Sequence, residues 1–168
     1  SISITIDTTA PDAPATLATT SSDTNDTTPI ITGNAEANST ITLLNGDVVI
    51  GTATTDSEGD FSVSPSSALA DGDYSLEAKA TDAAGNISSV SSSINITIDT
   101  TAPNAPTSLV DISDTNNTTP IITGTAEADS TITLLNGNVV IGTATTDSEG
   151  DFSVTPSAAL ADGDYSLE

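Results

Sequence analysis

The chain has 168 residues, of which 24 are acidic and one, Lys79, is basic, so its formal net charge is -23. A chain with so few cations cannot neutralise phosphates, which excludes a direct nucleic-acid partner and disfavours an anionic membrane surface. The sequence has no Cys and no His, so it lacks the usual ligands of zinc and copper and the base of a nucleophilic triad. With four aromatic residues it also lacks the platforms of a sugar cleft, and we expect no enzyme.

The predicted elements, taken in chain order, are short strands. Ile2, Ile4 and Ile6 alternate with Ser and Thr, which is the period of a half-buried strand. Asn45-Gly46 lies between two β-rich runs and predicts a type I′ hairpin, repeated at Asn136-Gly137. We expect no helix beyond a single turn at 66–70. In the first copy the strands are placed at 15–19, 29–35, 39–44, 48–55, 60–64, 73–81 and 88–98.

The last two of these strands carry the clearest alternation. Tyr74 and every second residue to Ala80 share one face of 73–81, and Val90, Ile94, Ile96 and Ile98 share one face of 88–98. Tyr74 follows the corner ALADGD, which matches a tyrosine corner, although an ordinary tyrosine at the start of a strand is the alternative. Seven short strands in about 90 residues predict an all-β fold, a seven-stranded antiparallel immunoglobulin-like β-sandwich.

Internal repetition gives the domain organisation. Residues 22–77 recur at 113–168 with six differences, and SISITIDTTAPDAP at 1–14 recurs as SINITIDTTAPNAP at 93–106. A period of 91 or 92 residues is too long for a solenoid turn and predicts a tandem array of domains. We expect residues 1–10 to be the last strand and linker of a preceding repeat, 11–102 a complete repeat, and 103–168 a repeat that stops before the end of its sixth strand.

Several motifs together resemble a known family. TTPIITGNAEANSTITLLNG, IGTATTDSEGDFSV, ALADGDYSLEAKATDAAGN and INITID are similar, in this order, to the bacterial immunoglobulin-like repeats of giant RTX-type surface adhesins and biofilm-associated proteins. The resemblance implies an extracellular protein at the bacterial cell surface or in the biofilm matrix, whose repeats hold a binding tip away from the cell, often with calcium at domain junctions. One departure is that the family's fifth strand usually carries Trp, where this chain has Phe61 and Phe152.

Acidic residues gather in the loops that should meet at one end of each repeat. So many neighbouring carboxylates repel one another unless a cation intervenes, and Ca²⁺ suits irregular sets of oxygen ligands. The alternative is that the acids are solvated and keep the protein soluble. The candidate calcium ligands in and before the first repeat are Asp7, Glu36, Asp56, Glu58, Asp60 and Asp82. Those at the junction between the repeats are Asp99, Glu127, Asp147, Glu149 and Asp151.

Three functions remain open on the sequence. The first is an extender repeat stiffened by calcium, with neighbouring repeats as its partners and no membrane insertion. The second is a module that binds a sugar or a protein. The third is a filament subunit that lends a strand to a neighbouring chain, because residues 1–6 have the pattern of a last strand and 103–168 contains no copy of that strand.

Overall fold

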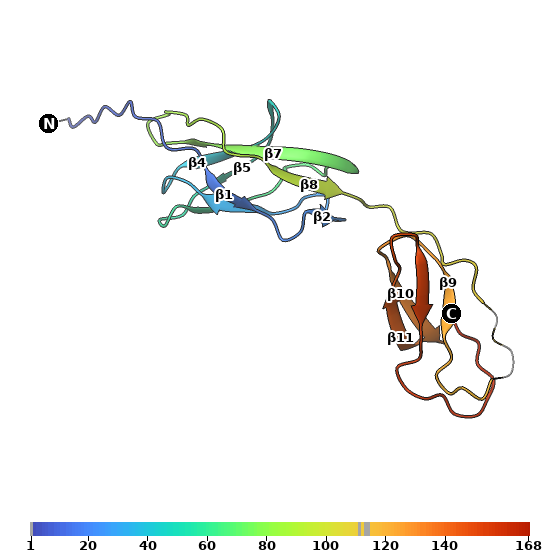
Figure 1. Ribbon diagram of the computed structural model, residues 1–168. Helices are drawn as coiled ribbons and strands as arrows, with labels where there is room; N and C mark the ends of the chain where they lie inside the picture. The colour runs from blue at the N-terminus through green and yellow to red at the C-terminus, as the bar shows by residue number, and fades with distance from the viewer. Residues whose placement is uncertain (1, 111, 113–114) are drawn as a thin grey trace. The chain divides into compact units, whose positions relative to one another are not determined.

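The computed structural model describes residues 2–110, 112 and 115–168 and divides into two compact units, Ser1–Thr101 and Ala102–Glu168 (Figure 1). All regular elements in the described part of the chain are strands, which confirms the all-β prediction, and no helix there could cross a membrane. The strands of the first unit are β1 (Ala15–Ala18), β2 (Asp23–Thr24), β3 (Ile31–Asn34), β4 (Thr40–Asn45), β5 (Val48–Thr54), β6 (Asp60–Val63), β7 (Gly72–Thr81) and β8 (Ile94–Ile98).

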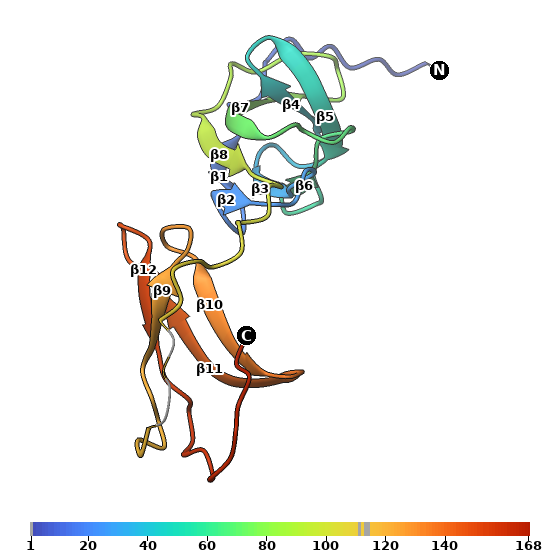
Figure 2. The same ribbon diagram turned by 90° about the vertical axis from the view of Figure 1, so that its right-hand side faces the viewer.

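The first unit consists of two sheets that face each other (Figure 2). One sheet has the order β1-β3-β6 and the other β2-β8-β7-β4-β5. Alternating apolar residues of both sheets point into the space between them and form one core. Ile31, Phe61 and Val63 come from the first sheet, and Ile41, Leu43, Leu76 and Ile96 are among those from the second.

A glycine makes room for the one large ring in this core. A Cβ atom on Gly33 of β3 would lie 2.7 Å from the Cζ atom of Phe61 and 2.8 Å from the carbonyl oxygen of Ala15. Both distances are shorter than any ordinary contact, so the phenyl ring packs directly on the backbone of β3. The ring of Phe61 therefore fills its place in the core only because position 33 has no side chain.

The β4–β5 hairpin is present as predicted, but its turn differs from the prediction. Asn45 pairs with Val48, so Gly46 and Asp47 are the two turn residues. Of these two only Gly46 has positive φ, +58°. Positive φ at the first central residue alone is the type II′ pattern, whereas type I′ needs it at both. The expected type I′ turn is therefore wrong, because Gly46 is the first of the two central turn residues and not the second.

β7 has the expected alternation and confirms the tyrosine corner. Leu76, Ala78 and Ala80 are fully buried. The Tyr74 hydroxyl donates a 2.9 Å hydrogen bond to the carbonyl of Ala70, four residues upstream. This bond ties the start of β7 to the corner that precedes it.

The last strand is shorter than predicted. β8 begins at Ile94 instead of residue 88, and Val90 is 42 % exposed instead of lying in the core. Before β8, the buried hydroxyls of Ser88 and Ser91 accept the backbone N–H groups of Ala80 and Ala78, each at 2.9 Å. Serine oxygens thus accept hydrogen bonds from β7 that the backbone of a neighbouring strand would otherwise accept. The apolar pattern alone does not reveal this.

β2 is a strand that the sequence analysis did not predict. It runs parallel to β8, with Asp23 opposite Thr97 and Thr24 opposite Ile98. The amide of Thr97 donates to the carbonyl of Ser22 at 2.6 Å, and that of Asp99 to Thr24 at 3.0 Å. Residues 2–6, in contrast, form no strand; Ile2, Ile4 and Ile6 are 98 %, 80 % and 77 % exposed, and Ser1 lies outside the described residues.

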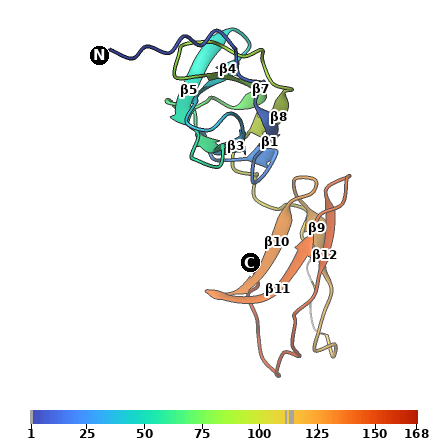
Figure 3. The same cartoon turned by 90° about the vertical axis from the view of Figure 1, so that its left-hand side faces the viewer.

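The second unit repeats part of this plan (Figure 3). Its core consists of Ile132, Leu134, Phe152 and Val154. Leu167 forms a bridge to Asn136, as Leu76 pairs with Asn45 in the first unit. Residues 163–166 form no strand, since their counterparts in the first unit, residues 72–75, pair only with β8. The strands are β9 (Ile122–Thr125), β10 (Thr131–Asn136), β11 (Val139–Thr145) and β12 (Asp151–Val154), paired as β10-β11 and β12-β9.

Candidate functional site at the two ends of the first unit

Three acidic loops emerge at one end of the first unit, as predicted. Thr40 of β4 is opposite Thr54 of β5 on one side and Thr81 of β7 on the other. The loops that precede residue 40 and come after residues 54 and 81 therefore leave the sheet side by side. We call this the N-terminal end, because Asp7 also contacts it.

In the loop after β5 the acids bind their own backbone. Oδ1 of Asp56 accepts the N–H groups of Glu58 at 3.0 Å and Asp60 at 2.9 Å. Gly59, at φ +90°, lets the chain turn back so that its N–H reaches the carbonyl of Asp56 at 3.2 Å. The carboxylate of Asp56 is thus the internal cap of a tight loop.

The loop after β7 is built in the same way and holds the N-terminal segment. Oδ1 of Asp82 accepts the N–H groups of Ala84 and Asn86, and its Oδ2 accepts the Asn86 amide at 2.8 Å. The hydrogen bond from the Asn86 side chain is the main reason why the pKa of Asp82 lies below its ordinary value. The same Asn86 amide donates to the carbonyl oxygen of Asp7 at 3.2 Å, so Asp7 and Asp82 meet at one side chain.

The remaining predicted ligands of this end are also exposed and locally bonded. The backbone carbonyl of Glu36 accepts the Thr55 hydroxyl at 2.6 Å. The Glu58 carboxylate accepts a hydrogen bond from the Ser57 hydroxyl at 2.7 Å, and the Asp60 carboxylate accepts one from the side-chain amide of Asn34.

The second unit repeats the loops of Glu36 and Asp56 almost bond for bond. Oδ1 of Asp147 accepts the N–H groups of Glu149 at 3.1 Å and Asp151 at 2.8 Å, and the carbonyl of Glu127 accepts Thr146 at 2.6 Å. The predicted association of these acids with Asp99 joins residues of different units and stays a prediction.

The opposite, C-terminal end of the first unit anchors the linker. Asp71, just before β7, accepts the Thr100 hydroxyl at 2.8 Å and N–H at 3.1 Å, and the Thr101 hydroxyl at 3.2 Å. The hydrogen bonds from Thr100 lower the pKa of Asp71. Asp99 caps the amide of Thr101 at 2.9 Å, as Asp7 caps Thr9 at 3.0 Å. The sequence analysis did not identify Thr100 and Thr101 as contacts of this end; the repeated Asp-Thr-Thr-Ala-Pro was the available signal.

Both ends of the first unit contain oxygen atoms that suit calcium, but their acidic side chains are not grouped as a calcium site requires. Carboxylate, amide and carbonyl oxygens are the ligands that Ca²⁺ prefers. Within the described residues, however, no three acidic side chains lie close enough together to hold one ion. A bound Ca²⁺ would therefore need backbone carbonyls and water for most of its six to eight ligands.

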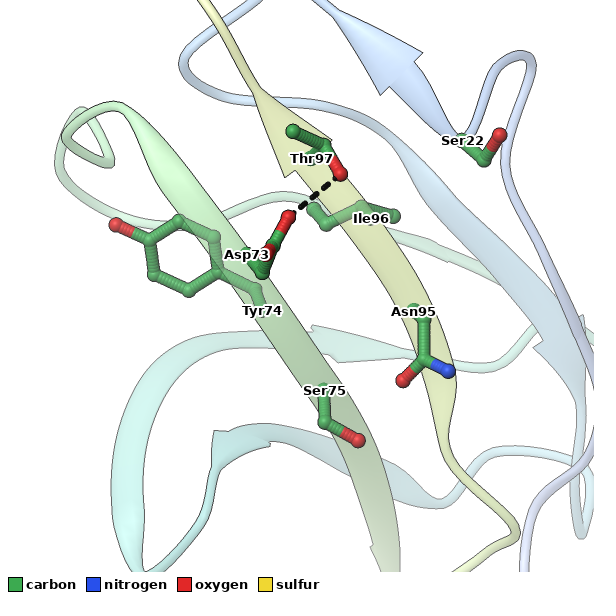
Figure 4. A pocket seen from close by; sticks show the side chains of 7 residues that line it. All are labelled: Ser22, Asp73, Tyr74, Ser75, Asn95, Ile96 and Thr97. Carbon is green, nitrogen blue, oxygen red and sulfur yellow. Dashed lines mark hydrogen bonds between the residues drawn. The ribbon is translucent and has the colours of Figure 1, made fainter.

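A shallow hollow of about 420 Å³ lies where β7 and β8 run side by side (Figure 4). Its polar lining includes Asp73, whose carboxylate accepts the Thr97 hydroxyl at 2.8 Å. Asn95, Ser75 and Ser22 line the rest, with Tyr74 and Ile96. Two of its polar side chains, those of Asp73 and Thr97, thus already bind each other.

The chain matches one family model and is similar to two solved structures. The family model of the bacterial Ig-like domain matches residues 2–100 and 110–168. A crystal structure of a tetra-tandem repeat in the extending region of a large adhesion protein is 28 % identical over 96 % of this chain, with a TM-score of 0.41. The BSP domain of a biofilm-associated protein is 22 % identical over 88 %, with a TM-score of 0.33. The chain spans 45 % and 25 % of those chains, and no curated protein matches it.

Proposed function

Because the chain belongs to the bacterial Ig-like domain family, we propose that its units are extender repeats of a longer protein of the bacterial cell surface or biofilm matrix, which hold a binding tip away from the cell. The observation that carries the proposal is the near-identity of the two copies. Only six of 56 matched positions differ, and no differing residue is buried in either unit. A spacer gains length from each copy, whereas a recognition surface needs only one specialised domain.

The linker contacts support this role. Pro103 and Pro106 restrict the backbone of the linker, and its start is bonded to Asp71 through Thr100 and Thr101. The first residues of the linker are thus held by the unit they leave. An extender requires such contacts and a flexible tether lacks them.

The aromatic residues favour the extender over a sugar-binding or protein-binding module. Aromatic anchors dominate recognition surfaces. Here Phe61 and Phe152 are buried in their cores, and the hydroxyls of Tyr74 and Tyr165 bind the backbone of their own corners. The aromatic side chains are therefore used for folding.

We further propose that calcium stiffens the repeats at their N-terminal ends. One contact supports this: the carboxylate of Asp82 and the backbone carbonyl of Asp7 accept hydrogen bonds from the same Asn86 amide, which brings together two oxygens of the kind that Ca²⁺ prefers. A net charge of -23 also attracts cations from solution. A calcium ion that binds only when the N-terminal segment is docked would stabilise the docked state by about 2.7 kcal/mol at a free calcium concentration of 100 times the Kd.

Small-angle scattering tests the extender role. Polypeptides of one, two and three copies of residues 11–102 should increase in maximum dimension by a constant step per copy. A dimension that stays nearly constant as copies are added would mean that the repeats fold back on one another, and would contradict the proposal.

The calcium proposal has a matched pair of variants. Chelator should lower the melting temperature of the wild type, and Asp82→Asn should remove this calcium-dependent difference. Asp47→Asn is the control with the same charge change, since residue 47 is an exposed turn residue whose counterpart is already Asn138. An equal calcium response in all three proteins would contradict a calcium site at Asp82, and no response in any of them would mean that the acids act only as a solubilising coat.

A further inference from the structure

The first unit contains the signature Asn-x-Ser/Thr, in which x is not Pro, at four places. In proteins of the cell exterior the asparagine of this signature accepts sugars, and it lies at the surface. A chain so rich in Ser and Thr also produces the signature by chance, so the structure has to choose among the four places. The asparagines are Asn25, Asn38, Asn86 and Asn95.

Two of the four signatures are held by hydrogen bonds of the fold. The side-chain amide of Asn86 donates to the carboxylate of Asp82 at 2.8 Å. Asn95 lies within strand β8, and the hydroxyl of Thr97, the third residue of its signature, donates to Asp73 at 2.8 Å (Figure 4). An enzyme would have to break these bonds before it could use either asparagine.

The signature at Asn38 has an exposed asparagine but a fixed backbone. Its middle residue, Ser39, is only 1 % exposed, and the N–H of Ser39 donates to the hydroxyl of Thr55 at 2.9 Å. Its third residue, Thr40, is already the first residue of β4. In the second unit Asp129 replaces Asn38, so this signature is not repeated.

The signature at Asn25 is free of these constraints. β2 ends at Thr24 and β3 begins at Ile31, so the signature lies in a loop. Asn25 is exposed, and no hydrogen bond among the described residues involves its side chain or the hydroxyl of Thr27. Within the described part of the chain, the backbone of 25–27 bonds another segment only at the carbonyl of Thr27, which accepts the N–H of Leu69 at 2.8 Å.

The second copy repeats the signature in the same loop. Asn116-Asn117-Thr118 is the counterpart of Asn25-Asp26-Thr27, and Asn116 is exposed too. We propose that Asn25, and Asn116 in the second unit, accept an N-linked sugar. The extender role does not use this site, so either proposal can fail without the other.

The reaction joins the Nδ2 atom of Asn25 to C1 of a sugar that is activated by a diphosphate group. The bond between C1 and the phosphate oxygen breaks, the diphosphate leaves with the electron pair of that bond, and Nδ2 loses one proton. The donor is a sugar on a nucleoside diphosphate or on a lipid diphosphate, since both supply the same chemistry.

The position of the loop decides where the sugar would stand. The carbonyl of Thr24, the residue before Asn25, accepts the N–H of Asp99 at 3.0 Å, and Asp99 is where the linker begins. Each repeat would therefore carry one bulky, hydrophilic group at its C-terminal end.

Mass spectrometry of the protein isolated from the cells that make it tests the proposal. Cleavage after glutamate gives a peptide that ends at Glu36 and carries Asn25, and a peptide 37–58 that carries Asn38. The first should be heavier than its sequence by whole sugar residues, and the second should not. Sugars added one at a time indicate a nucleoside diphosphate donor, and an oligosaccharide of one size indicates a lipid diphosphate. A first peptide with the mass of its sequence would overturn the proposal.

Two substitutions at Thr27 separate the signature from exposure alone. Thr27→Val removes the hydroxyl that the signature requires and should abolish the added mass, although Asn25 is still present. Thr27→Ser keeps the signature and should retain the mass. Asn95→Gln, in a signature held within a strand, should change nothing. Added mass that persists in Thr27→Val, or a sugar on Asn86 or Asn95 in place of Asn25, would overturn the inference. None of these results affects the scattering test of repeat length.

Discussion

The phenyl ring of Phe61 should not tolerate a methyl group at Gly33. A Cβ at this position meets the Cζ atom of the ring at 2.7 Å and the carbonyl oxygen of Ala15 at 2.8 Å. The ring has to leave its rotamer or β1 has to move away from β3, because the second contact is with backbone. Overpacking of this kind costs about 1–3 kcal/mol. At about 4–8 °C per kcal/mol, Gly33→Ala should lower the melting temperature of the first unit by roughly 4–24 °C.

Calorimetry of the whole chain can assign this effect to one unit. Gly124→Ala is the matched change in the second unit, where the Cβ would lie 2.8 Å from both Cζ of Phe152 and the carbonyl oxygen of Thr107. Each substitution should shift a different transition. Ser62→Ala, an exposed position on the neighbouring strand β6, is the control for introducing alanine.

A double-mutant cycle separates the ring from the backbone contact. In a Phe61→Leu background, Gly33→Ala should cost less, because the smaller side chain leaves room, but it should still cost something through Ala15. If Gly33→Ala melts within about 2 °C of the wild type, or costs the same in both backgrounds, the packing of the ring on β3 is not as described.

Three further substitutions test contacts along β7. Tyr74→Phe removes the corner hydrogen bond and should cost about 0.5–1.5 kcal/mol in urea unfolding; an unchanged midpoint would refute the corner. Ser91→Ala leaves the buried N–H of Ala78 without its acceptor and should cost about 1–3 kcal/mol, whereas the exposed Ser92→Ala should be neutral. The pKa of Asp71 is lowered on folding, so its carboxylate stabilises the first unit above the unfolded pKa of about 3.9, and this contribution is lost as the pH falls through the folded pKa. Asp71→Asn should therefore reduce the loss of stability on acidification below about pH 4; an identical acid transition would argue against the contact.

The strands with strong alternation were predictable from sequence, and those held by polar groups were not. β4 and β7 carry apolar residues at every second position, β5 follows the Asn45-Gly46 turn, and all three lie close to their predicted ranges. β2 has only Asp23 and Thr24, whose two backbone contacts to β8 leave no pattern in the side chains. The stretch before β8 contains Val90 in the right phase for a strand, but the hydroxyls of Ser88 and Ser91 determine its path.

The candidate site was predictable in its position but not in the use of its acids. Strand alternation correctly brought the loops of Glu36, Asp56 and Asp82 to one end of the first unit. Composition could not tell whether a carboxylate binds an ion or its own backbone. The available signal was Asp-x-x-Gly at 56–59 and 82–85, where Gly59 and Gly85 have positive φ and turn the chain back onto the aspartate.

The parallel pairing of β2 with β8 has a mechanical consequence. β2 belongs to the N-terminal part of the unit and β8 leads directly into the linker, so a tension applied to the two ends of the unit pulls these strands past each other along their length. The hydrogen bonds from Thr97 to Ser22 and from Asp99 to Thr24 lie across that direction and are loaded at the same time. They must break together, whereas an antiparallel hairpin pulled from its open end separates one bond after another. The first unit thus places a shear clamp between the two points where force reaches it.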